Sequence, residues 1–488
     1  MALVTGVEAT ERPLATAPRP TPALRAGTRR PWRHWPLALV LAPAVALRVL
    51  AFVAIYPGIW FTDSNGYVAV GATGDLHLDR VSGYGLLVAP FYRLGSAAAL
   101  IGFQHLLGLA IVVALYALLV HRGVPTWLAA LAVVPIALDA YVLAVEHAIM
   151  SDTLFDFTIV AAVVLLLWPE RPSLWMVAAA GLLLGFAGLV RSVGAPFVAV
   201  FFIYLAVRRL GWRSLVAFAV PWVLITVAYA AMFDAQHGHF ALNLTTGRYL
   251  YGQVARFADC SKLPGLPADE RSFCPDVAHP LTTNDYLWGH RSPIHEVART
   301  DDGHIRDFAL RVIRRWPMRY ANVVGSSFIH YFRPGHPVGP NDYKPIPWQF
   351  PVDPARPDFP RYRGPIRPHH PGDHWYYPST YVSRMVAQPH TNAGVSRFLR
   401  GYQRFGYTQG PLLAACVLVA LAALFRRGRH WRLRLDGALL AAAALSALLL
   451  AAALSVFSYR YVLTAVVLLP PAAALSLTAL LPPRLRRG

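Results

Sequence analysis

The chain consists of apolar runs separated by short polar turns, with one long polar stretch after its midpoint. Many of these runs hold about 18–22 residues with almost no charge, the length a helix needs to cross roughly 30 Å of hydrocarbon. Lipid offers the backbone no hydrogen-bond partner, so such runs must be helical. The alternating strands of roughly ten residues that mark a membrane β-barrel are absent from the sequence. The pattern therefore predicts an all-α polytopic membrane protein.

We expect about ten membrane-spanning helices, which divide the chain into five regions. Polar tails at 1–34 and 481–488 flank a transmembrane module at 35–233, an extracytoplasmic domain at 234–410 and further transmembrane helices at 411–480; the first tail should be disordered. The expected spans are 35–56, 96–120, 126–144, 153–168, 174–190, 194–207, 215–233, 411–425, 437–457 and 461–480. Residues 61–95 should form a partly helical segment along the outer interface.

The charge balance fits this topology. The formal net charge is +20 at pH 7, yet no recognised nucleic-acid motif is present, so we expect no nucleic-acid partner. Arginines instead gather in short loops, most densely at 426–434, as the positive-inside rule requires of cytoplasmic loops. Ten spans place every basic short loop and both termini in the cytoplasm. The protein should therefore be a multi-pass protein of the cell membrane, with the bilayer as a partner.

Two of the three cysteines, Cys260 and Cys274, fall in the long polar stretch, with Pro264 and Pro267 between them. Outside the cytoplasm a disulfide could close this small sub-loop, and two unrelated free thiols are the alternative. Cys416 lies within an apolar run and should be a buried packing residue.

Ionisable residues recur at four of the predicted outer junctions. Asp63 follows the first span, and Arg191 and Arg460 lie between later pairs of spans. The junction between the third and fourth spans carries Glu146, His147 and Asp152. Charges at the edge of the hydrocarbon cost a few kcal/mol unless they are paired or hydrated, so we expect a polar cavity here. The alternative is that the arginines reach to lipid headgroups.

This combination suits a particular chemistry. A positioned aspartate can act as general base toward a hydroxyl group. An arginine fork matches a phosphate group and stabilises the charge that develops as the phosphate leaves. A cavity at membrane depth is where a lipid phosphate would lie while its tail stays in the bilayer.

Several sequence motifs resemble those of the GT-C membrane glycosyltransferases, which include protein mannosyltransferases and aminoarabinose and arabinofuranosyl transferases. FTDSNGYVAVG resembles their acidic first external loop, and VEHAIMSDTLF resembles their second. GLLLGFAGLVRSVGAP and SYRYVLTAVVLLPPAAAL resemble spans that end or begin at an arginine. LTTGRYLYGQVARFADC is similar to external-loop sequence of actinobacterial members. Many relatives carry two adjacent acidic residues in the first loop, whereas here Asp63 precedes Ser64.

The resemblance implies an inverting enzyme with a polyprenyl-phosphate-linked sugar as donor and a glycan, lipid or protein as acceptor. Asp63 would be the base, with Glu146 and Asp152 supporting the acceptor or a cation. Arg191, Arg460 and Tyr461 would hold the donor phosphate, and the further candidates are Tyr67, His147 and Arg248.

No metal ligand is assigned, because the metal requirement varies across this superfamily, and a divalent cation remains an open alternative. His369, His370, His374 and Asp373 match no standard zinc spacing. A transporter or flippase is the rival function, although such proteins place ionisable groups near the bilayer midplane. A third alternative is a scaffold whose external domain binds cell-wall polymer.

Overall fold

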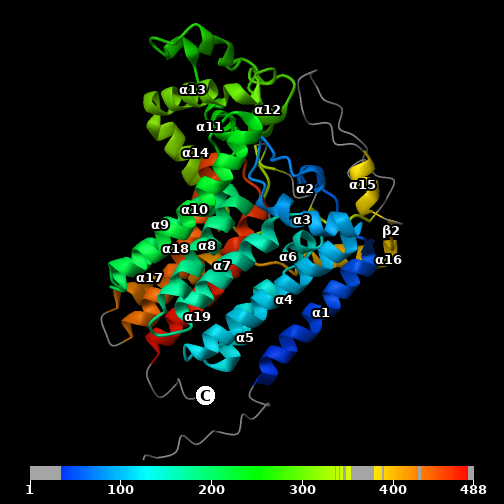
Figure 1. Cartoon of the computed structure of the whole chain (residues 1–488), viewed down its shortest axis with the longest axis vertical. Coiled ribbons are helices and arrows are strands. Elements are labelled where there is room, and N and C mark those ends of the chain that lie inside the picture. The colour runs from blue at the N-terminus through cyan, green and yellow to red at the C-terminus, as the bar shows by residue number, and fades with distance from the viewer. Residues whose placement is uncertain are drawn as a thin grey trace, which may run out of the picture.

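A computed structural model describes residues 34–335, 337–339, 341–343, 348–352, 379–386, 389–426 and 430–481. Over these residues the chain is mainly helical, and its long helices lie side by side in a bundle (Figure 1). The predicted all-helical membrane class is therefore confirmed. The expected tails and His369, His370, Asp373 and His374 lie outside the described residues.

The bundle is built from the apolar runs of the sequence. Apolar side chains of these helices form one large core, and their backbone groups are satisfied within each helix. The helices are α1 (Trp35–Ala54), α4 (Ala97–His121), α5 (Thr126–Leu138), α6 (Ala140–Glu146), α7 (Asp152–Leu167), α8 (Leu174–Val190), α9 (Ala195–Val207), α10 (Trp212–His237), α17 (Gly410–Phe425), α18 (Trp431–Leu454) and α19 (Leu463–Leu480).

Each of the ten predicted spans coincides with helical structure, but the helices differ in length. Among the described residues, five helical segments are long and apolar enough to cross a membrane alone: α1, α4, α10, α18 and 459–480. The helices α8, α17 and 192–207 are apolar but shorter. The number of ten spans remains a prediction.

The expected third span at 126–144 is not one continuous helix. It breaks at Asp139 into α5 and α6, which are bent by 55° relative to each other. Asp139 adopts an extended backbone, and its carboxylate accepts hydrogen bonds from the backbone N–H groups of Tyr141 and Val142. Its other oxygen accepts from Thr408 N at 2.6 Å. The aspartate therefore caps a new helix, and the N-cap preference of aspartate explains the break.

A buried ionic cluster joins three helices at one end of the bundle. The carboxylate of Asp436, near the start of α18, forms an ion pair with Arg122 at the end of α4. It also accepts a hydrogen bond from Tyr204 Oη at 2.7 Å and lies 3.7 Å from Arg208 Nη1, both near the end of α9. These contacts place three of the arginine-rich turns at the same end of the bundle.

Two short helices, α2 (Thr62–Thr73) and α3 (Gly83–Leu94), lie at the other end, within the segment expected to follow the interface. The start of α2 is joined to the loop before α7: Ile59 N donates to His147 O at 2.8 Å, and Ser64 Oγ donates to Ile149 O at 3.0 Å. This join brings the two predicted acidic loops together.

The predicted 234–410 domain divides between two cores. The part that we call the cap, residues 243–330, contains α11 (Thr246–Val254), α12 (Thr283–Trp288), α13 (Asp302–Arg315) and α14 (Pro317–His330). These helices gather at one end of the bundle, above the ends of α18 and α10 (Figure 1). Residues of α11 and α13 and the loops around them form a second core, separate from that of the bundle.

The rest of that segment packs on the bundle instead. It contains α15 (Ser379–Met385), the strand β2 (His390–Thr391) and α16 (Ala393–Tyr402). The strand β2 pairs antiparallel with β1 (Ile55–Tyr56) directly after α1, and α16 packs along α1. Val382 and Leu399 belong to the bundle core. Only the cap is thus built around a core of its own.

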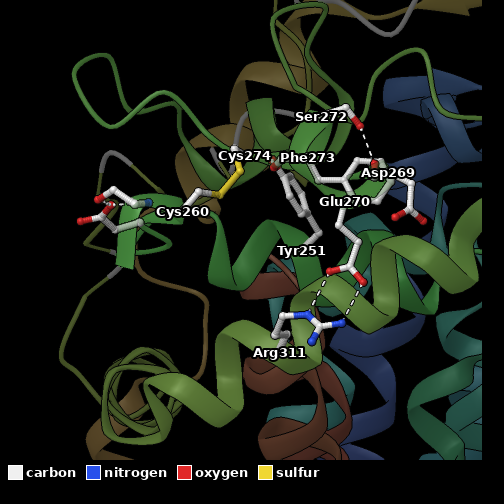
Figure 2. The surroundings of a disulfide bond; sticks show 10 residues. Tyr251, Cys260, Asp269, Glu270, Ser272, Phe273, Cys274 and Arg311 are labelled. Carbon is white, nitrogen blue, oxygen red and sulfur yellow. Dashed lines mark hydrogen bonds and ion pairs between the residues drawn. A yellow bond between two sulfur atoms is a disulfide. The ribbon is translucent and has the colours of Figure 1, made fainter. Parts of the chain in front are cut away.

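A disulfide joins Cys260 and Cys274 in the cap (Figure 2). Between these cysteines, Glu270 accepts two hydrogen bonds of 3.1 Å from the guanidinium of Arg311 on α13. Tyr251 of α11 donates from its hydroxyl group to Phe273 O at 2.8 Å. The sub-loop is therefore held to both core helices of the cap.

Replacing Cys260 and Cys274 together with serine should destabilise the cap by about 3 kcal/mol, because an open loop of this length gains entropy in the unfolded chain. We expect faster limited proteolysis within 243–330, and mild reduction of the wild-type protein should have the same effect. The Cys416→Ala variant is the control for the remaining thiol. Equal cleavage rates in the serine variant and the wild-type protein would contradict this role.

Candidate active site

A cavity of about 930 Å³ lies where the cap meets the end of the bundle. Most of its lining comes from α2 with the loop after it, the end of α8, the cap, and the end of α18 with the turn that follows; Ser151, Tyr343 and Trp348 also line it. The charged residues that line it are Asp63, Asp79, Arg80, Arg191, Arg248, Glu296, Arg299 and Arg460. Arginines outnumber carboxylates on this lining, which favours an anionic ligand.

Asp63, Arg191 and Arg460, predicted at outer junctions, line this cavity, and Asp152 lies beside it, next to the lining residue Ser151. Arg460 Nη1 lies 3.2 Å from Asp63 Oδ2, and Arg460 Nη2 lies 3.0 Å from Asp152 Oδ2. Arg191 forms a second ion pair with Asp152. The side chains of both arginines are 10% exposed, and that of Asp152 is 5% exposed. The cluster therefore alternates carboxylates and guanidinium groups, which compensate each other's desolvation.

Local structure explains how each of these groups is presented. Asp63 and Asp152 lie in the first turns of α2 and α7, where the helix dipole favours a negative charge. Arg191 occupies the extended C-cap position of α8. Arg460 lies in a 3₁₀ turn, Tyr459–Val462, where its backbone N–H donates to Ser458 Oγ at 3.3 Å.

Asp63 carries a second charged contact that the sequence did not predict. Arg80 Nη1 lies 2.9 Å from Asp63 Oδ1, so the carboxylate is held between two arginines. Burial alone would raise the pKa of Asp63, but the positive charges of Arg80 and Arg460 outweigh it and lower that pKa to about 2. In the absence of substrate Asp63 is thus an ionised carboxylate throughout the physiological range.

The predicted tyrosines Tyr67 and Tyr461 also line the cavity. Tyr67 Oη lies 3.2 Å from Ser151 Oγ, next to Asp152, and the guanidinium of Arg80 lies 5.5 Å from its ring centroid. Tyr461 Oη lies 2.8 Å from Ser455 Oγ, and the guanidinium of Arg191 lies 5.7 Å from its ring. Both rings therefore support arginines of the cluster through cation–π contacts.

Glu146 and His147 lie in a neighbouring buried network and do not line the cavity. Glu146 forms an ion pair of 2.8 Å with Arg48 of α1 and lies 3.1 Å from His105 of α4. His105 Nε2 is 3.0 Å from His147 Nδ1. A Cβ atom on Gly108 would come within 1.9 Å of the Glu146 carboxylate, so α4 needs glycine there. The network fixes the loop that leads to Asp152.

Arg248 reaches the cavity from the cap. Its guanidinium donates to Val297 O at 3.1 Å, and its backbone N–H donates to Asp302 Oδ1 at 2.8 Å. It is the one candidate from the cap that the sequence identified.

Asp79, Arg80, Trp288 and Arg299, which also line the cavity, were not among the predicted residues. For Asp79 and Arg80 the sequence offered a signal: in the motif DLHLDR they are adjacent charged residues in the same interfacial segment as Asp63.

Among the described residues, no group of three or more His, Cys, Asp and Glu side chains is arranged to hold a metal ion.

Residues 90–235 match the family model described as dolichyl-phosphate-mannose-protein mannosyltransferase. The predicted resemblance to the GT-C enzymes is confirmed. The matched region includes Glu146, Asp152 and Arg191, whereas Asp63 and Arg460 lie outside it.

Two solved structures resemble the chain, and no curated protein sequence matches it. They are ArnT from Cupriavidus metallidurans bound to undecaprenyl phosphate, at 13% identity and a TM-score of 0.35, and the same protein in the apo state, at 14% identity and a TM-score of 0.34. Both comparisons cover 91% of this chain and 77% of the other.

Asp152→Ala should destabilise the protein by about 3–5 kcal/mol, because Arg191 and Arg460 would lose a buried counter-charge. Thermal unfolding in detergent measures the effect, and the double variant Asp152→Ala, Arg191→Ala should recover part of the loss. Glu170→Ala is the matched control: its ion pair with Arg432, at 3.1 Å, is exposed. An unchanged melting temperature in Asp152→Ala would show that the pairs contribute no stability.

Proposed function

We propose that the protein transfers a sugar, with inversion, from a polyprenyl-phosphate donor to a hydroxyl group of a cell-envelope acceptor at the extracytoplasmic face. One observation carries the proposal: a half-buried carboxylate, Asp63, shares a cavity at the end of the membrane bundle with Arg191 and Arg460. The match to a family whose description names a lipid-phosphate sugar supports the donor class.

Each group has a role in the transfer. The Asp63 carboxylate takes the proton of the acceptor hydroxyl as its oxygen bonds to the anomeric carbon. The bond between that carbon and the phosphate oxygen breaks, and its electron pair stays on the polyprenyl phosphate. Arg191 and Arg460 stabilise the negative charge that develops there. Tyr461 orients Arg191, and Asp152 holds both arginines in place.

The low pKa of Asp63 makes it a weak base before the donor binds. Arg460, which pairs with Asp63, is also one of the two arginines assigned to the phosphate. When the phosphate competes for Arg460, the carboxylate loses part of its counter-charge, so its pKa rises and it becomes a better base. Donor binding would in this way prepare the base before the acceptor reacts.

Glu146 and His147 are assigned a positioning role through the loop before Asp152. The hydrogen bonds of Gln104 Nε2 to Glu146 O, at 2.8 Å, and to Ala148 O, at 2.7 Å, support this role. Arg248, on the cap side of the cavity, faces the space left for the acceptor.

The arrangement of basic turns supports the proposed orientation. The Asp436 cluster gathers Arg122 and Arg208 at the start of α18, whereas Leu454 at the end of that helix packs against the cap core. The basic turns are therefore at the end of the bundle away from the cavity. Cytoplasmic basic turns then put the cap and cavity outside and both termini inside.

The direct test is to incubate purified protein with radiolabelled polyprenyl-phosphate hexoses and pentoses and a cell-envelope extract. Label should move into glycan, lipid or protein. Failure to transfer label or to hydrolyse any donor would overturn the proposal, and uptake of intact donor into proteoliposomes would instead favour a transporter.

Asp63→Asn should lower the transfer rate about 10²–10⁴-fold, the usual contribution of a general base, because the amide cannot accept the proton. Membrane insertion should be retained, and the melting temperature should fall only moderately, because Arg80 and Arg460 lose a partly exposed counter-charge. Asp75→Asn, an exposed aspartate after the same helix, is the matched control and should retain full activity. Near-normal turnover in Asp63→Asn would exclude Asp63 as the base.

Arg80→Gln should move the acid limb of kcat/KM to higher pH. Arg80 lowers the pKa of Asp63, so its loss raises that pKa, and the ionised base is then lost earlier as pH falls. The pH profile of the free enzyme's kcat/KM reports this group. An acid limb that stays at the wild-type position would show that Asp63 does not control it.

A further inference from the structure

The cap side of the cavity presents an aromatic surface that the proposed transfer step does not use. Trp288, the last residue of α12, lines the cavity and is 40% exposed. Tyr249 of α11 packs edge to face against it, with ring centroids 6.0 Å apart. An indole ring fixed in this way and open toward a cavity offers a flat apolar face to a ligand.

Charged hydrogen-bonding groups lie next to this face. The guanidinium of Arg299 lies 5.9 Å from the Trp288 ring, and Arg299 Nε donates to Asp79 Oδ1 at 2.7 Å. The Arg299 and Asp79 side chains are 20% and 7% exposed, respectively. Both residues line the same cavity. The surface therefore combines an aromatic ring with a donor group that lies over the ring and an acceptor group paired with that donor.

This platform is continuous with the reacting end of the cavity. Arg80 forms an ion pair with Asp63 and also lies within electrostatic reach of the Tyr249 hydroxyl. Tyr249 in turn contacts Trp288. A molecule lying on Trp288 would thus extend along the cap wall toward the proposed base.

Among the three acceptor classes, a saccharide fits this surface best. The C–H face of a sugar ring packs on an indole, and its neighbouring hydroxyl groups can donate to a carboxylate and accept from a guanidinium. An acyl chain would leave the buried Asp79 and Arg299 beside apolar atoms. A peptide bound by strand addition would need an exposed sheet edge, and the cap elements described are helical.

We propose that Trp288, Asp79 and Arg299 form an acceptor subsite for a saccharide, so that the enzyme extends a glycan. This inference rests on the proposed function. The acceptor hydroxyl loses its proton to Asp63 and forms the new glycosidic bond, while the donor's bond to phosphate breaks; the products are the extended glycan and polyprenyl phosphate.

The test compares acceptors with the labelled polyprenyl-phosphate sugar that the wild-type enzyme turns over. Octyl glycosides and short oligosaccharides should accept label, and serine- or threonine-containing peptides should not. Trp288→Ala should raise the acceptor KM about tenfold or more with little change in the donor KM, because the stacking surface is lost. Trp288→Tyr, which keeps a flat ring, should restore most of the affinity.

Arg299→Ala should also raise the acceptor KM, and Arg306→Ala is its matched control, an exposed cap arginine paired with its neighbour Asp307 that should behave like the wild-type enzyme. Transfer to peptides alone, or an unchanged saccharide KM in both Trp288→Ala and Arg299→Ala, would overturn the subsite and leave the glycosyltransferase proposal intact. Absence of transfer and of donor hydrolysis in the wild-type enzyme would instead overturn the proposed function, and the subsite with it.

Discussion

The bridge that Asp152 forms between Arg191 and Arg460 holds the active end of the bundle together. The two arginines are far apart in the transmembrane sequence and are almost fully buried. Neither could remain charged there without a carboxylate, because a buried and unpaired ion costs several kcal/mol. The same pairs leave Arg460 in contact with Asp63, so one cluster both closes the helix packing and sets the charge of the proposed base.

The meeting of these residues could be predicted because it depends mainly on counting apolar runs. Once the number of crossings is assumed, Asp63, Asp152, Arg191 and Arg460 fall at the same membrane depth. Glu146 shows the limit of that reasoning. It comes from the same junction as Asp152, but the turn at the end of α6 directs it toward Arg48 and His105. The membrane depth of a residue follows from its position in the sequence, whereas the direction of its side chain depends on how the helix breaks and packs.

The residues that the sequence did not identify lie in an irregular loop and in the cap. There the spacing of apolar residues does not predict which side chains meet. Arg80 and Asp79 follow α2 in an irregular loop whose path is set by contacts with distant residues, such as that of Thr245 Oγ with Asp79 O at 2.8 Å. Likewise, the polarity of 234–410 marked it as external but did not show that α16 packs on α1 while α11 and α13 form a separate core. Aromatic residues such as Trp288 occur both in packed cores and on exposed surfaces. Only the structure shows that the Trp288 side chain is exposed.

The separate core of the cap also affects how the two halves of the cavity can vary. Substitutions that repack Tyr251, Phe273 or Phe308 act mainly within the cap, because these side chains contact one another in its core, against which Leu454 of α18 also packs. The wall carrying Trp288 can therefore be reshaped while the arginine cluster on the bundle stays in place. Under the proposed function, variation of the acceptor side of the cavity would then be confined to one folded segment of the chain.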